Sequence, residues 1–191
     1  ESFEVLIARF SYSDYSMFPF NPSQSMPANA SEVMEKCCAA LDCLGQKYFL
    51  ATGTALGIYR EGGFINNDSD IDIDIVGEVD FHAINSAFNK IGMTLGRKVA
   101  YKGKISQLVY YSKDKVLFDM CVWTVKGGYV YNYLPELFFR ARRHPIKYYK
   151  NPNQITFRNR TYMIPAPTDE WLALQYGSDW RIPKKYKRHW A

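Results

Sequence analysis

The strongest chemical signal in the chain lies in residues 70–75, where aspartate and isoleucine alternate. On a β-strand, this period of two sends Asp70, Asp72 and Asp74 to one face and the isoleucines to the other. Aspartate is depleted in strands, and like charges on one face repel each other. Such a face is unfavourable unless a cation binds it, and a divalent metal ion is the obvious cation.

A further acid of this kind lies in a later apolar run. Asp119 is the only acid in residues 116–123, and the other members of that run are apolar. Strand residues at i and i+2 are about 6.8 Å apart at Cα, so Asp70 and Asp72 can reach one hard cation, and Asp119 on a neighbouring strand would complete the set. The sequence therefore predicts a Mg²⁺ or Mn²⁺ site at Asp70, Asp72 and Asp119. Two alternatives remain: the acidic face blocks an exposed sheet edge, or Asp119 is a buried acid satisfied by hydrogen bonds.

The residues before the acidic strand are suited to bind phosphate. Gly53 and Thr54 precede a short helix predicted over residues 55–61, which the Gly62-Gly63 pair ends. A helix N-terminus offers backbone N–H groups to anions, so Gly53 and Thr54 are candidate substrate-binding residues. The alternative is an ordinary turn from strand to helix.

The remaining elements predict the architecture. Helices are expected over residues 31–44 with Ser31 as the cap, after Asp80, and from Thr168 to Gly177; strands are expected at 47–51, 70–75, 107–111, 116–123, 129–133 and 155–164. Because helices and strands interleave while several strands are close enough for hairpins, this pattern predicts an α/β chain with a mixed sheet flanked by helices. Residues 1–30 are predicted to form an irregular, aromatic-rich arm, and residues 31–191 a single domain.

Composition excludes several classes of protein. With 47% hydrophobic and 16% aromatic residues, the chain is globular. A net charge of +5 fits an anionic substrate, but it is too modest for a nucleic-acid binder, which would carry a dense basic stripe. No apolar run approaches the roughly 20 residues that span a bilayer, so no transmembrane segment is predicted in this chain.

Cysteines and glycosylation sequons bear on the compartment. The four cysteines include no CxxC pair, which predicts reduced and mostly buried thiols. Sequons occur at Asn29, Asn67 and Asn159. A glycan on Asn67 would obstruct the acidic site, and Asn159 lies inside a predicted strand. These positions favour the cytoplasm, and the Golgi lumen is the alternative if an anchor upstream of Glu1 was removed.

Three segments resemble one family. The run from Gly53 to Ile73 is similar to the LicD pattern G-T-L-L-G-x-x-R-x-x-G-F-I-P-W-D-x-D-I-D-I, in a family that includes fukutin and fukutin-related protein. Phe118-Asp119 resembles the family's apolar strand with its single Asp, and residues 165–180 resemble its closing helix. Two departures are the replacement of Pro-Trp by Asn66-Asn67 and an Asp at position 74, where members often carry a small residue. The resemblance implies a nucleotidyltransferase-like fold.

The resemblance also implies an activity. Members look like phosphotransferases that take a phospho-alcohol from a CDP-activated donor, such as CDP-choline or CDP-ribitol. They pass it to a sugar hydroxyl of a glycan and release CMP. A cation held by Asp70, Asp72 and Asp119 would neutralise charge on the departing CMP.

Other residues receive narrower assignments. Arg60 matches the family's Arg and is assigned to phosphate binding or to holding the acidic loop; a structural ion pair with Asp68 or Asp70 is the alternative. Asp68 or Asp74 is the candidate general base.

A basic stretch and two competing functions complete the predictions. The cluster of Arg140, Arg142, Arg143, His144 and Lys147 is a candidate for binding the diphosphate or a sugar chain, with Arg140 and Arg143 as the selected substrate-binding residues. A solvated basic face is the alternative. The chain is also compatible with NTP-dependent nucleotidyl transfer to a small molecule, which would release pyrophosphate. It is compatible, too, with a non-catalytic carbohydrate- or nucleotide-binding module, although the three intact aspartates weigh against that function.

Overall fold

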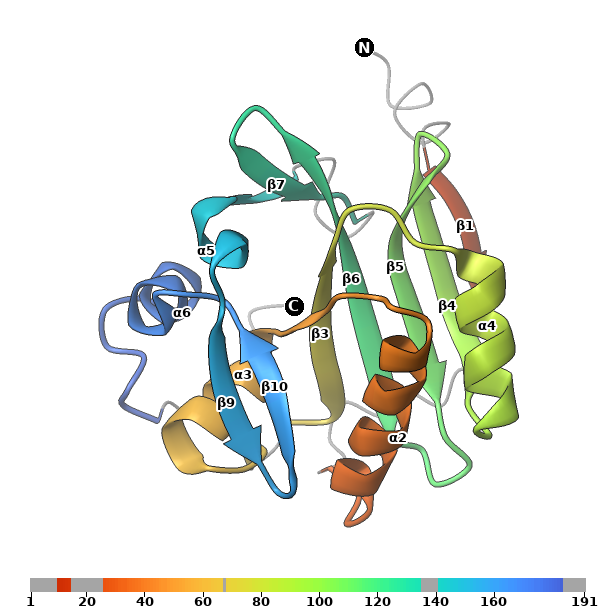
Figure 1. The fold of residues 1–191 in the computed structure, drawn as a ribbon, viewed down its shortest axis with the longest axis horizontal. Helices are drawn as coiled ribbons and strands as arrows, with labels where there is room; N and C mark the ends of the chain where they lie inside the picture. Colours follow the sequence, from red (N-terminus) through yellow and green to blue (C-terminus); the bar gives the residue numbers. More distant parts are fainter. Residues whose placement is uncertain (1–9, 15–25, 67, 135–140, 184–191) are drawn as a thin grey trace, which may run out of the picture.

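The computed structural model describes residues 10–14, 26–66, 68–134 and 141–183. Within these residues, eight strands form one mixed sheet and two form a separate hairpin (Figure 1). The sheet comprises β1 (Phe10–Asp14), β2 (Phe49–Leu50), β3 (Asp70–Val76), β4 (Thr94–Tyr101), β5 (Lys104–Tyr111), β6 (Leu117–Lys126), β7 (Tyr129–Asn132) and β8 (Arg142–Pro145). The hairpin comprises β9 (Asn153–Phe157) and β10 (Arg160–Ile164). The predicted mixed sheet is confirmed.

The strand order is β1-β4-β5-β6-β3-β2, with β7 paired to β6 and β8 paired to β7. The β3–β6 pair is parallel, whereas the other pairs of this sheet are antiparallel. The acidic strand β3 therefore lies between β6 and β2 rather than at an edge. Because β3 pairs with one strand on each side, its aspartates do not serve to block an exposed sheet edge, and that alternative is wrong.

Helices cover the sheet unevenly. They are α2 (Ala30–Cys43), α3 (Thr52–Glu61), α4 (Phe81–Lys90), α5 (Lys147–Lys150) and α6 (Thr168–Tyr176). In Figure 1, α2 and α4 lie in front of the sheet, while α3, α6 and the β9–β10 hairpin gather beside β3. Phe88 of α4 contacts Phe118 of β6 with ring centroids 5.7 Å apart, and Phe118 pairs with Ile71. The isoleucines of β3 therefore belong to the core under these helices, and the aspartates belong to the opposite face.

Two predicted helix caps are wrong. The first helix begins at Ala30 with Asn29 as the cap residue, so Ser31 lies inside it. The last helix begins at Thr168 itself, after Pro167, and the Thr168 hydroxyl donates instead to the carbonyl of Pro165 at 2.9 Å. Hydroxyl residues are common both at a cap and in the first turn, and the sequence does not distinguish positions one residue apart.

Two other local predictions are confirmed. Asp80 caps α4 by accepting a hydrogen bond from the Ala83 amide at 3.0 Å. Gly127 and Gly128 connect β6 to β7 as a tight hairpin, and both have positive φ, which suits the two central residues of such a turn. The helix cap and the turn each depend on neighbouring residues alone, so both could be predicted from the sequence.

Strand predictions fail where charges interrupt the pattern. β4 was not predicted, because Gly96, Arg97 and Lys98 break its alternation. β1 pairs with β4, so residues 10–14 of the predicted irregular arm extend the sheet; residues 1–9 and 15–25 lie outside the described residues.

The strand predicted over residues 155–164 is two strands. β9 and β10 pair antiparallel, and the chain turns at Arg158, which has a φ of 55°. Asn159 is therefore exposed on a turn, so the prediction that its sequon lies inside a strand is wrong.

The described residues contain no helix long and apolar enough to cross a membrane. All four cysteines are free, as predicted; Cys43 is exposed, and the other three are buried.

Candidate active site

The predicted acidic cluster is assembled by the pairing of β3 with β6. In the parallel register, Asp72 lies directly opposite Asp119. Asp70, Asp72 and Asp119 each offer one carboxylate oxygen, and these atoms lie within 4.8 Å of one another. The structure thus brings together the three acids that the sequence predicted as cation ligands.

The electrostatics of this cluster are unfavourable for three free carboxylates. Burial, followed by the charges of Asp70 and Asp119, raises the pKa of Asp72 well above its ordinary value. Burial, followed by the charge of Asp70, raises the pKa of Asp119 to about 7. The same two causes raise the pKa of Asp68 to about 7. Each carboxyl opposes ionisation of its neighbours, so negative charge accumulates there only at an energetic cost.

The donor set fits a hard divalent cation. It consists of carboxylate oxygens, which Mg²⁺ and Mn²⁺ prefer. In addition, Oδ2 of Asp68 is buried and has no hydrogen-bond partner among the described residues. Carboxylates that repel one another, beside an orphaned oxygen, are the environment that a bound cation would relieve.

The first turn of α3 fixes Asp72. The helix begins at Thr52, so Gly53 and Thr54 lie in its first turn rather than in a preceding loop. The Gly53 amide donates to Oδ2 of Asp72 at 3.2 Å, and the Asp72 amide donates to Oγ1 of Thr54 at 2.9 Å. The positive end of the helix also favours the Asp72 charge. The Gly53 N–H predicted to meet phosphate is therefore used by Asp72.

Gly53 has no room for a side chain. A Cβ on Gly53 would lie 2.3 Å from Oδ2 of Asp68, whereas a Cβ on Gly63 would meet nothing within 4 Å. We therefore expect Gly53→Ala to displace Asp68, to destabilise the fold by about 1–3 kcal/mol and to weaken Mn²⁺ binding. Urea unfolding and titration calorimetry measure both effects. Gly63→Ala is the matched control, and equal losses in the two variants would contradict this account.

The chain is similar to proteins of one known family. The family model "LicD/FKTN/FKRP, nucleotidyltransferase domain" matches residues 45–167. The chain belongs to this family. Ribitol-5-phosphate transferase FKTN of Homo sapiens is 26% identical over 161 residues, which cover 82% of this chain and 34% of that protein. FKTN of Mus musculus is 26% identical over 160 residues, with the same coverage. The LicD chain spans about a third of the length of these relatives.

A solved structure supports the fold. The lincosamide antibiotic adenylyltransferase LnuA, with lincomycin bound, aligns with a TM-score of 0.54 at 12% identity, covering 80% of this chain and 87% of that one. The LicD chain therefore has the nucleotidyltransferase-like fold that its sequence predicted.

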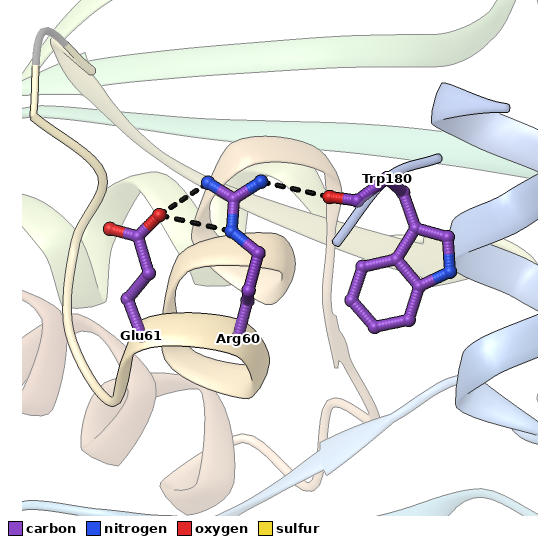
Figure 2. Close-up of polar contacts among 3 residues, drawn as sticks. All are labelled: Arg60, Glu61 and Trp180. Atoms are coloured by element: carbon purple, nitrogen blue, oxygen red, sulfur yellow. Dashed lines mark hydrogen bonds and ion pairs between the residues drawn. The ribbon is translucent and has the colours of Figure 1, made fainter. Parts of the chain in front are cut away.

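Arg60, the arginine of the LicD motif, connects two segments of the fold (Figure 2). Its Nη1 donates to the carbonyl oxygen of Trp180 at 2.9 Å, and its Nε donates to Oε1 of Glu61 at 3.0 Å. The side chain is 12% exposed. These contacts differ from the ion pair with Asp68 or Asp70 that was the alternative. They give Arg60 a packing role between α3 and the segment after α6, and phosphate binding by Arg60 remains a prediction.

Asp74 is enclosed by hydrogen-bond donors. Nε1 of Trp123 donates to Oδ1 at 2.7 Å, and the Tyr149 hydroxyl donates to Oδ2 at 2.9 Å. His144 bonds Tyr149 through Nδ1 and Gln175 through Nε2. Both oxygens of Asp74 are therefore engaged, and the network ties the LicD strand β3 to β6, α5, β8 and α6. This arrangement favours a structural role over the predicted general-base role.

Of the arginines in the basic stretch, Arg142 is the one that the described structure directs toward the site. Arg140 lies outside the described residues, and the exposed Arg143 stacks over Tyr129 at 4.7 Å. Arg142, one position earlier on β8, donates from Nη2 to Sγ of Cys121 at 2.8 Å. Its charge is close enough to Asp74 and Asp119 to lower the pKa of both carboxyls, against the larger effect of burial.

One site residue, Gln107, was missed by the sequence analysis. Nε2 of Gln107 donates to both oxygens of Asp119, at 3.0 and 2.8 Å. The inward direction of Arg142 follows from the alternation of β8, a strand that the sequence did not reveal. For Gln107 the sequence carried little signal, because Lys104 and Ser106 of the same strand are polar as well.

Proposed function

We propose that this LicD domain transfers a phospho-alcohol, such as ribitol phosphate or phosphocholine, from a CDP-activated donor to a sugar hydroxyl of a glycan, with release of CMP. The observation that carries the proposal is the set of three carboxylates on two paired strands of a LicD-family domain. The names of the FKTN relatives support ribitol phosphate as the first alcohol to test.

Each acid has a task in this proposal. Asp70, Asp72 and Asp119 would hold Mg²⁺ or Mn²⁺, and the bound cation would supply positive charge to the diphosphate under attack. Gly53 and Thr54 keep Asp72 in place through the two hydrogen bonds of the first turn of α3. These hydrogen bonds join β3 to α3 within the fold itself, and electrostatic catalysis depends on groups held in place in this way.

Arg142 would add a fixed positive charge on the same face. Its guanidinium is held by Asn132 and Cys121 and packs over Trp123 at 5.2 Å. A half-buried and oriented guanidinium suits phosphate oxygens, which it can bind through two parallel N–H groups. The exposed Arg143 is proposed to contact a longer substrate farther from the acids.

Asp68 is the better candidate for the general base. Its Oδ1 accepts a hydrogen bond from the Ser69 amide at 3.1 Å, while its Oδ2 accepts none from the described residues. Asp74, by contrast, has both oxygens occupied. A base needs an available oxygen within hydrogen-bond reach of the hydroxyl that it deprotonates.

Product analysis tests the function directly. Incubation with Mg²⁺ and a panel containing CDP-ribitol, CDP-choline and CDP-glycerol is expected to release CMP from one member, faster with an acceptor glycan than without it. ATP and CTP are the matched controls and should yield no pyrophosphate. Pyrophosphate release from a nucleoside triphosphate, with no CMP from any donor, would instead establish nucleotidyl transfer.

A further inference from the structure

Gln107 approaches the acid cluster from β5, on the side of β6 opposite to β3. It is 5% exposed, and its Nε2 donates to both oxygens of Asp119. In the antiparallel register Gln107 pairs with Cys121, two residues along β6 from Asp119 and on the same face. The amide therefore reaches Asp119 diagonally, which is within range of a long side chain.

The other end of this amide makes no bond. Oε1 of Gln107 is buried and has no hydrogen-bond partner among the described residues. A buried carbonyl oxygen without a partner is costly, and a side chain with a purely structural role would avoid that cost. Reversing the amide would bring Oε1 against the Asp119 carboxylate, so Asp119 fixes its orientation.

The hydrogen bonds leave Asp119 able to bind a cation. Each carboxylate oxygen has two lone pairs, and the Gln107 amide uses one on each oxygen. An N–H donor stabilises the charged form of Asp119, which is the form that a metal ion binds. A residue that hydrogen-bonds to a metal ligand and orients it in this way commonly strengthens the binding of the metal ion.

We infer that Gln107 is a positioning residue that holds Asp119 in the orientation required to bind the divalent cation. The inference rests on the proposed function only in requiring a cation at Asp70, Asp72 and Asp119. It assigns Gln107 no contact with substrate.

Titration calorimetry with Mn²⁺ tests the inference. Gln107→Leu keeps the volume and removes the donor, and Gln107→Asn keeps the amide but is too short to reach Asp119. Each is expected to bind Mn²⁺ about 10–100-fold more weakly than the wild type. The control is Ser112→Ala just after β5, which removes a buried hydrogen bond from the Val116 amide and should change affinity less than twofold. Circular dichroism verifies folding, and Gln107→Asn provides the measurement if Gln107→Leu does not fold.

A double-mutant cycle separates positioning from a general structural effect. If Gln107 acts through Asp119, then Gln107→Leu should weaken Mn²⁺ binding no further in a background of Asp119→Asn. Additive losses, or a folded variant of Gln107 with wild-type affinity, would overturn the inference. Mn²⁺ binding without CMP release from any CDP-alcohol would refute the proposed function alone, whereas absence of Mn²⁺ binding by the wild type would overturn both.

Discussion

If the proposed function is correct, Asp72→Asn is expected to lower the rate of CMP release from the CDP-alcohol donor by about 10³-fold, because it removes a central ligand of the proposed cation. This factor corresponds to about 4 kcal/mol of lost transition-state stabilisation, within the several kcal/mol that a catalytic metal supplies. The fold should persist, since an Asn side-chain oxygen can still accept the hydrogen bond from the Gly53 amide. Steady-state kinetics at saturating Mg²⁺ measure the effect.

The matched control is Asp114→Asn, which alters an acid bonded to Asn29 at 2.7 Å and exposed to solvent. It should retain activity within about twofold, because surface substitutions away from special contacts have small effects. Wild-type turnover by the Asp72 variant would refute the role of this acid in catalysis.

The second large effect concerns stability without metal. The pKa of Asp68 and of Asp119 is raised to about 7, whereas an aspartate in the unfolded chain has a pKa of about 4. The folded state therefore binds more protons than the unfolded state between these values, and stability falls as pH rises from about 4 to 7. Above pH 7 the full penalty is present. A difference of about 3 in pKa corresponds to about 4 kcal/mol for one acid, so these acids should make the free energy of unfolding of metal-free wild type lower at pH 8 than at pH 4 by at least that amount.

Comparison with Asp72→Asn isolates this effect. Removing one charge relieves the others, so the metal-free variant should have a Tm at pH 8 higher than the wild type by roughly 3–10 °C, and the difference should nearly vanish at pH 5. His144 acts in the opposite direction, since burial lowers its pKa to about 4, but its contribution cancels between the two proteins. Excess Mg²⁺ should stabilise only the wild type at pH 8, by about 2.7 kcal/mol at 100 times its Kd. Parallel pH profiles for the two proteins would contradict this expectation.

The sequence predicted the acids well because their signal is local. Alternation of Asp and Ile fixes which side chains share a face of β3, and an isolated Asp in an apolar strand requires a partner. The register that sets Asp72 opposite Asp119 was not predictable, since β3 and β6 are separated by α4, β4 and β5. Only the tertiary structure could show that the two strands are parallel neighbours.

The contacts of the other site residues depend on strand pairing between segments far apart in the sequence. Gln107 reaches Asp119 only because β5 and β6 are antiparallel in one particular register. Arg142 and Arg143 are adjacent and chemically alike, and the phase of β8 alone directs one inward and the other to solvent. Arg60 was predicted from its motif, but its partner Trp180 lies 120 residues away. The sequence shows which residues could act in a site, but it does not show which distant residues they contact.

The contact between Arg60 and Trp180 also bears on where the functional unit ends. The family match stops at residue 167, before α6, yet Trp171 and Trp180 are both buried. The Trp180 carbonyl binds the guanidinium carried by α3, the same helix whose first turn holds Asp72. A recombinant fragment cut at residue 167 would lose part of the scaffold behind its own acid cluster, so the smallest unit suited to biochemical work extends to at least residue 182.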